Sequence, residues 1–181
     1  MIAQEKIETF KEELQLIDNE KVRNNVIHIL SVTDDYFYHI PASSTGKYHP
    51  DFALGEGGLI RHTKAAVKIA DCMLNLVMFS ALKGDRDYII AALILHCKKN
   101  GDGEQYTRAD HPILAANFIY DNCIDVIIGG KIAELVKTHM GQFNTDFKTG
   151  KVILPPALSP VQKFVHLADY LASRKFLNIN F

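Results

Sequence analysis

The sequence Gly57-Gly58-Leu59-Ile60-Arg61-His62-Thr63 joins a long loop to a long helix. The residues before it, 41–58, are rich in proline, serine and glycine, so we expect them to form mostly loop. We expect the helix to cover residues 59–82. It would carry His62 near its start, where neighbouring helices of a bundle can bring further polar side chains to one internal point.

The N-terminal part of the chain has the apolar spacing of two further helices. Apolar residues among charged ones predict an amphipathic helix within residues 2–17, and Asp18-Asn19 can start the next helix. The apolar face of this second helix would consist of Val22, Val26, Ile29 and Leu30.

The C-terminal half predicts four more helices, over residues 88–96, 112–122, 131–139 and 159–174. Gly129-Gly130 is expected to break the chain before the third of them. Ser159 and Pro160 suit the N-cap and first position of the last. Residues 98–103 and 141–158 are expected to be loops, the second with a short hairpin around residues 148–151. Together, these predicted helices and loops indicate an all-α bundle.

Composition places the chain among ordinary globular proteins. It has 181 residues, of which 48% are hydrophobic and 23% charged, and this length suits a single domain. A net charge of -1 gives no argument for general binding to nucleic acid or membrane, although a local basic patch remains compatible with it. No apolar run reaches the roughly 18 residues of a membrane span, and the N-terminal residues lack the shape of a signal peptide. Three cysteines make no disulfide framework, so we expect a reducing, cytoplasmic location.

Histidines recur in an order that predicts one buried metal site. Imidazole and carboxylate groups suit divalent ions such as Zn, Mn, Fe, Ni or Co. Adjacent residues at a helix end point about 100° apart around the axis, so a neighbouring pair can contact two ions, or one ion and a supporting group. The elements concerned are His62, His96-Cys97, Asp110-His111, Thr138-His139 and Ala168-Asp169.

This ordered series resembles the HD-domain superfamily of metal-dependent phosphohydrolases over roughly residues 35–175. It is most similar to the HD domain of bacterial 3′-5′ exoribonucleases and of small stand-alone relatives. The matching elements are Ile40-Pro41-Ala42-Ser43 with Tyr48-His49-Pro50, then residues 57–63, 110–111, 138–141 and 168–169.

The resemblance implies an HD-type helical bundle with long loops before the first and last ligand helices. The whole chain, 1–181, would be one domain, with residues 1–34 as N-terminal helices and 35–175 as the core. His62, His96 and Asp169 would form the basic metal site. His111 and His139 would extend it to a second ion or, around a single ion, support the ligands or bind substrate. The implied cofactor is one or two ions of Mn, Fe, Ni, Co, Zn or Mg.

The resemblance also implies a reaction. Relatives hydrolyse phosphate esters of nucleotides, cyclic dinucleotides or RNA ends with metal-activated water, as phosphomonoesterases or phosphodiesterases. A small nucleotide or other phosphoester is therefore the expected substrate, with RNA as an alternative. The RNA alternative is weaker because the chain has neither an appended nucleic-acid-binding module nor a basic excess. No membrane partner is expected, and no oligomeric state is predicted.

Cys97 departs from the family pattern, which has aspartate after the second histidine. A thiolate can bind zinc or iron but is softer than carboxylate, and a buried free cysteine is also common. Lys99 and Gly101 come one residue earlier than the family spacing, and they match it if one residue is missing between His96 and Cys97. The alternative function is therefore a degenerate HD domain that binds metal or nucleotide without efficient turnover.

Other polar residues are candidates for substrate contact. Lys98 and Lys99 could stabilise phosphoryl oxygens as catalytic groups, or simply be a solvated helix end. Lys47 and His49 could cover the site from the loop before His62, or pack as ordinary loop residues. Arg61 could contact substrate or be a solvated residue, and Gln142 and Asn144, which follow His139, could contact substrate. His166, one turn before Asp169, could orient that carboxylate or lie in the core.

Overall fold

A computed structural model describes residues 1–181 except 44–45, 48, 98–106, 147–148, 178 and 180–181. As predicted, the described residues form an all-α structure, with eight α-helices and no strand. The α-helices are α1 (Ala3–Glu8), α2 (Lys11–Gln15), α3 (Glu20–Val32), α4 (Gly58–Leu74), α5 (Arg86–Leu95), α6 (His111–Asn122), α7 (Val126–Val136) and α8 (Pro160–Ala172). Three 3-10 helices join them: η1 (Asp35–Tyr38), η2 (Asp51–Ala53) and η3 (Val77–Asp85).

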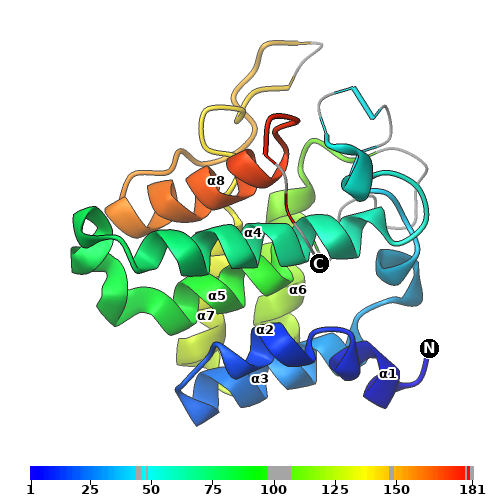
Figure 1. The fold of residues 1–181 in the computed structure, drawn as a ribbon, viewed down its shortest axis with the longest axis vertical. Helices are drawn as coiled ribbons and strands as arrows, with labels where there is room; N and C mark the ends of the chain where they lie inside the picture. Colours follow the sequence, from blue (N-terminus) through cyan, green and yellow to red (C-terminus); the bar gives the residue numbers. More distant parts are fainter. Residues whose placement is uncertain (44–45, 48, 98–106, 147–148, 178, 180–181) are drawn as a thin grey trace.

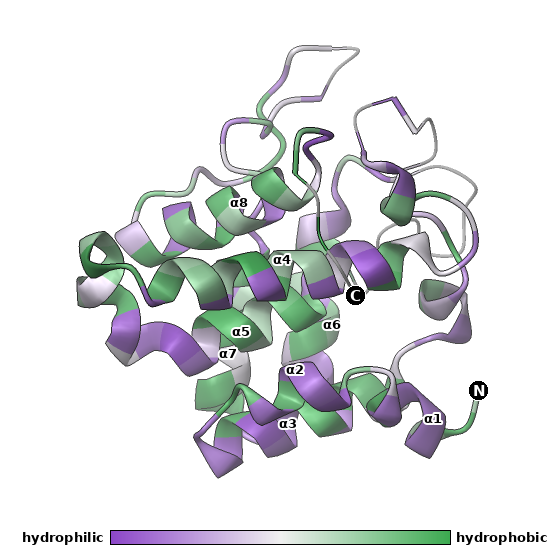
Figure 2. Cartoon of the chain, viewed as in Figure 1, coloured by the Kyte–Doolittle hydropathy of each residue, from purple (hydrophilic) through white to green (hydrophobic). Residues whose placement is uncertain are grey.

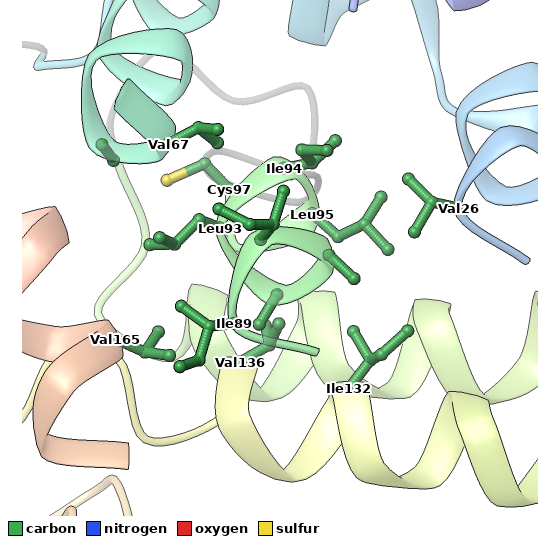
Figure 3. Close-up of a cluster of buried hydrophobic side chains, with 14 of the residues drawn as sticks. Val26, Val67, Ile89, Leu93, Ile94, Leu95, Cys97, Ile132, Val136 and Val165 are labelled. Atoms are coloured by element: carbon green, nitrogen blue, oxygen red, sulfur yellow. The ribbon is translucent and has the colours of Figure 1, made fainter. Parts of the chain in front are cut away.

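Helix α5 forms the centre of the bundle. Each residue from Ile89 to Leu95 is fully buried, which is the pattern of a helix surrounded by protein on every side. In Figure 1, α4 and α8 lie on one side of α5, and α3 lies on the opposite side. Figure 2 shows hydrophobic residues along α5, whereas hydrophilic and hydrophobic residues alternate on α3. In Figure 3 the side chains around α5 are Val26 of α3, Val67 of α4, Ile132 and Val136 of α7, and Val165 of α8.

The helix starts predicted at residues 19 and 159 are confirmed. The side chain of Asn19 accepts hydrogen bonds from the backbone N–H groups of Lys21 and Val22. Ser159 accepts from the N–H of Gln162, whose side chain in turn accepts from the Ser159 N–H, with Pro160 at the first helical position. These bonds satisfy donors that a helix leaves unpaired at its start.

Two predicted helices are shorter than expected. The helix within residues 2–17 is divided at Thr9-Phe10 into α1 and α2, and the Phe10 side chain at this break is fully buried in the core. The helix predicted over residues 59–82 ends as α4 at Leu74 and is followed by η3. The apolar residues that suggested the longer helix include Val77 and Met78, which are 88% and 80% exposed.

The break predicted at Gly129-Gly130 is wrong, because both glycines lie inside α7. Asp125 caps this helix by accepting from the N–H groups of Ile127 and Ile128. A Cβ atom on Gly129 would lie 2.4 Å from the Cys123 sulfur. The glycine therefore allows α7 to approach the turn from α6 closely, rather than ending a helix.

The loops predicted over residues 41–58 and 141–158 are confirmed where they are described, whereas the loop predicted over residues 98–103 lies outside the described residues. Residues 41–57 contain only the short η2, and residues 141–158 contain a single bridge between Thr145 and Val152. Around this bridge Asp146 N–H donates to the Lys151 carbonyl at 2.8 Å, which gives a small hairpin.

Within the described ranges, no single helix has the length and apolar composition of a membrane span. Residues Gly58–Leu74 and Val77–Leu95 meet that test together, as a pair bent by 117°.

Candidate metal centre

Six predicted ligands lie together inside the bundle. All of them are buried except Asp169, whose side chain is 14% exposed. Their ligand atoms form three overlapping groups, each within 4.8 Å: His62, His96 and Cys97; Cys97, His111 and His139; and His96, His139 and Asp169. We call these six residues the ligand cluster.

The ligand cluster is assembled at the ends of helices, around the end of α5. His96 caps the C-terminus of α5, and Cys97 follows it. His111 is the first residue of α6, and His139 lies three residues after the end of α7. His62 and Asp169 come from α4 and α8, which pack against each other.

Three histidines each make the same kind of local hydrogen bond. In each, ring atom Nδ1 contacts the backbone carbonyl three residues earlier, at 2.6 Å for His96, 2.7 Å for His111 and 2.6 Å for His139. A carbonyl oxygen only accepts, so Nδ1 must carry the proton and Nε2 of the neutral ring has a free lone pair. Metal-binding histidines commonly donate their second ring nitrogen to a backbone carbonyl in this way.

His111 and His139 face each other through these Nε2 atoms, which are 3.1 Å apart. Two lone pairs at this distance repel unless a proton or a cation lies between them. Burial lowers the pKa of His139, although Cys97 acts in the opposite direction. The neutral ring is therefore favoured, and the pair fits a bound cation.

A second part of the cluster surrounds Asp169. Its Oδ1 atom lies 2.9 Å from Nε2 of His62 and 3.1 Å from Nε2 of His96. The contact between Asp169 and His96 does not have the geometry of a hydrogen bond. The buried atoms Nε2 of His96 and Nδ1 of His62 therefore have no hydrogen-bond partner. Burial raises the pKa of Asp169, but the charges of His96 and His62 more than offset it and hold the pKa well below its usual value. The anionic carboxylate of Asp169 and the unpaired Nε2 of His96 are suitable ligands for a cation.

Cys97 connects the two parts. It belongs to the group with His62 and His96 and also to the group with His111 and His139. Burial raises the pKa of its thiol, but the charge of His96 and the contacts with His111 and His139 hold it well below the usual value. The same pairing raises the pKa of His96 well above its usual value, against the effect of burial. The sulfur is therefore available as a thiolate ligand.

His49 adds a further imidazole beside the cluster. Its ring centre is 5.3 Å from that of His62, and its buried Nδ1 has no hydrogen-bond partner. Burial, followed by the charge of His62, lowers the pKa of His49 to about 4. The positive charge of Arg174 acts in the same direction. The loop before α4 thus places a neutral ring against the cluster.

The other predicted substrate residues lie in different surroundings. Arg61 donates to the backbone carbonyls of Phe52, Leu54 and Glu56, so its guanidinium holds the loop that precedes α4. Lys47 is exposed. Lys98 and Lys99 lie outside the described residues. Substrate contact by these residues stays a prediction.

His166 has a role that the sequence did not indicate. Its Nδ1–H donates to the backbone carbonyl of His139 at 2.7 Å, so it supports the turn that carries this ligand rather than Asp169. Gly141, in that turn, has a φ of +54°, and a Cβ there would lie 2.3 Å from the His166 ring. Arg174, whose guanidinium lies 4.4 Å from the centre of the Tyr170 ring, was also missed, since only the fold brings it near His49.

Comparison with protein-family models, with curated proteins and with solved structures finds no match for this chain. The structure supports an all-helical chain with buried His, Cys and Asp groups that could bind metal.

Proposed function

We propose that this chain is an HD-type, metal-dependent phosphohydrolase that acts on a nucleotide-like phosphoester. The observation that supports it best is the arrangement of His96, His111 and His139. Each ring has its Nδ1–H bound to a backbone carbonyl, so that three Nε2 atoms lie close to a carboxylate and a thiol. Apart from the thiol of Cys97, these groups belong to the ligand set implied by the resemblance to the HD-domain superfamily.

In this proposal the cluster holds one or two divalent ions. His62, His96 and Asp169 would hold the first, and His111 and His139 the second, with Cys97 within reach of both. A bound divalent ion lowers the pKa of a water molecule and offsets negative charge on a phosphate. A reducing, cytoplasmic setting is part of the proposal, because the free thiol of Cys97 has to be kept.

The chain itself supplies groups that can orient the substrate. The neutral imidazole of His49 can form a hydrogen bond to a phosphoryl oxygen, since its buried Nδ1 has no protein partner. The positive charge of Arg174 also acts on His49. Lys98 and Lys99 remain proposed phosphoryl-binding residues.

The test combines metal content with hydrolysis. The purified chain should contain one or two ions, and with added Mn²⁺, Ni²⁺ or Fe²⁺ it should hydrolyse nucleotides and bis(p-nitrophenyl) phosphate. His111→Gln should reduce the metal content, whereas His28→Gln, at an exposed position on α3, should leave it unchanged. Absence of bound metal together with absence of hydrolysis with every ion would contradict the proposal.

A second function is favoured by the thiol at position 97. A sulfur ligand holds soft ions tightly and suits hydrolysis less well than a carboxylate, so the cluster could bind metal or nucleotide without efficient turnover. Cys97→Asp, or an aspartate inserted after His96, separates the two functions. A large gain in turnover supports a phosphohydrolase weakened at this position, and retained ligand binding without any gain supports a binding protein.

A further inference from the structure

A pocket of about 330 Å³ lies next to the turn that carries His139. Its lining comes from the segment between His139 and α8 and from α8 itself, including His166 one turn before Asp169. Figure 1 shows this segment, between α7 and α8, as a loop beside α8. The pocket, which we call the side pocket, is lined by Gly141, Gln142, Asn144, Pro156, Ala157, Lys163 and His166.

The side pocket is joined to the ligand cluster by His166. This ring lines the pocket and donates from Nδ1 to the carbonyl of His139. Because Nδ1 carries the proton, Nε2 of the neutral ring is a hydrogen-bond acceptor. A molecule bound in the side pocket would therefore lie next to the turn that positions a metal ligand.

The polar lining offers both donors and acceptors. The Gln142 amide carries an oxygen and an NH₂ group, and His166 adds an acceptor. Asn144 adds its amide oxygen, while its NH₂ group donates to the Leu154 carbonyl. An isolated phosphate needs donors only, and the one cationic side chain of the lining is the exposed Lys163. Nucleobases and sugars present donors and acceptors together, which this lining matches better.

The apolar surroundings suit a flat ring. Pro156 and Ala157 contribute nonpolar surface to the side pocket. Phe143, between the two amide residues, is 48% exposed, and its ring is stacked on Tyr170 with centres 5.9 Å apart. A volume of 330 Å³ is near the lower end of the range for small-molecule pockets, about 300–1,000 Å³, which fits one nucleoside rather than a longer chain.

We infer that the side pocket holds the nucleoside part of the substrate while its phosphate lies at the ligand cluster. The inference rests on the proposed function, and it adds a choice of substrate: nucleoside phosphates over phosphoesters that lack a base and sugar.

Two substrates test this specificity. A nucleotide should use the side pocket, whereas bis(p-nitrophenyl) phosphate has no nucleoside. Gln142→Ala should raise KM for the nucleotide about tenfold through the loss of its hydrogen bonds, with kcat/KM for bis(p-nitrophenyl) phosphate changed less than about twofold. Lys151→Ala, which removes an exposed lysine outside the lining, should alter neither substrate. Equal losses on both substrates, or none on the nucleotide, would overturn the inference.

A binding measurement separates this inference from the proposed function. The four common ribonucleosides, which have no phosphate, are titrated into the metal-free chain and followed by NMR chemical-shift changes. Binding that Gln142→Ala weakens supports the side pocket even if nothing is hydrolysed. If hydrolysis occurs but no nucleoside binds, the metal function stands and the side pocket has been assigned wrongly.

Discussion

Replacing Gly141 with alanine should destabilise the chain by more than the backbone conformation alone explains. Its φ of +54° lies in the left-handed region, which costs a residue with a side chain roughly 1–2 kcal/mol. The new Cβ would lie 2.3 Å from the His166 ring, so the ring must move. Loss of its hydrogen bond to the carbonyl of His139 adds about 1–3 kcal/mol, because an acceptor is left unpaired. The expected total is about 2–5 kcal/mol of unfolding free energy.

Gly55→Ala is the matched control. Gly55 has a φ of +67°, and a Cβ there would have no neighbour within 4 Å, so this variant carries only the backbone cost. Both variants are measured by urea denaturation at equilibrium. Gly141→Ala should be less stable than Gly55→Ala by about 1–3 kcal/mol, which is the contribution of the lost contact.

A double variant shows whether His166 is the cause. In a His166→Ala background there is room for the new methyl group, so Gly141→Ala should cost only about as much as Gly55→Ala. The reasoning is refuted if Gly141→Ala is no more destabilising than the control, or if its cost is the same with and without the ring.

Three other predictions concern the metal, the core and the acid limit. Titration with Co²⁺ should produce a sulfur-to-cobalt charge-transfer absorption band, because Cys97 supplies a thiolate. Cys97→Ser should remove this band. A band that persists in the variant excludes the Cys97 sulfur as a ligand. Leu93→Ala should lower the unfolding free energy by about 2–5 kcal/mol, since the side chain is fully buried. Leu158→Ala, at an exposed position, should change the unfolding free energy by less than about 0.5 kcal/mol. Similar urea midpoints for the two variants would contradict the central place of α5. A hydrogen bond from Lys6 lowers the pKa of Asp35 from 3.8 to about 2, so this contact stabilises the fold above pH 3.8 and is lost as the pH falls toward 2. In Asp35→Asn the melting temperature should fall less steeply than in the unchanged chain as the pH is lowered over that interval. The same pH dependence of the melting temperature in both would count against the contact.

The ligand cluster was predictable from the sequence because its members occupy recognisable local positions. Each histidine of the cluster occurs near the predicted start or end of a helix, where side chains of several helices can meet. The caps at Asn19 and Ser159 depend on hydrogen bonds within three residues, so local sequence specified them as well. What the sequence supplied was the order of the ligands, and the contacts among them required the fold.

The errors arose where tertiary packing decides the structure. Glycine has a high cost inside a helix, so Gly129 predicted a break, but close contact with Cys123 makes a residue without a side chain necessary there. Spacing also cannot distinguish buried from exposed apolar residues, and Val77 was therefore assigned to a helix that ends before it. The partners of Arg61 and His166 are carbonyl groups, which every residue has, so no sequence pattern could identify them.

The ligands of the cluster are contributed by segments far apart in the chain, and this affects the order of events in folding. His62 and Asp169, which share a hydrogen bond, are separated by 107 residues. In a zinc finger the ligands are close in sequence, so the metal can drive folding. Here the entropy of closing such a loop has to be met first by helix packing around α5. We expect the bundle to form before it takes up an ion, so that the rate of metal uptake by unfolded chains reports the completion of folding.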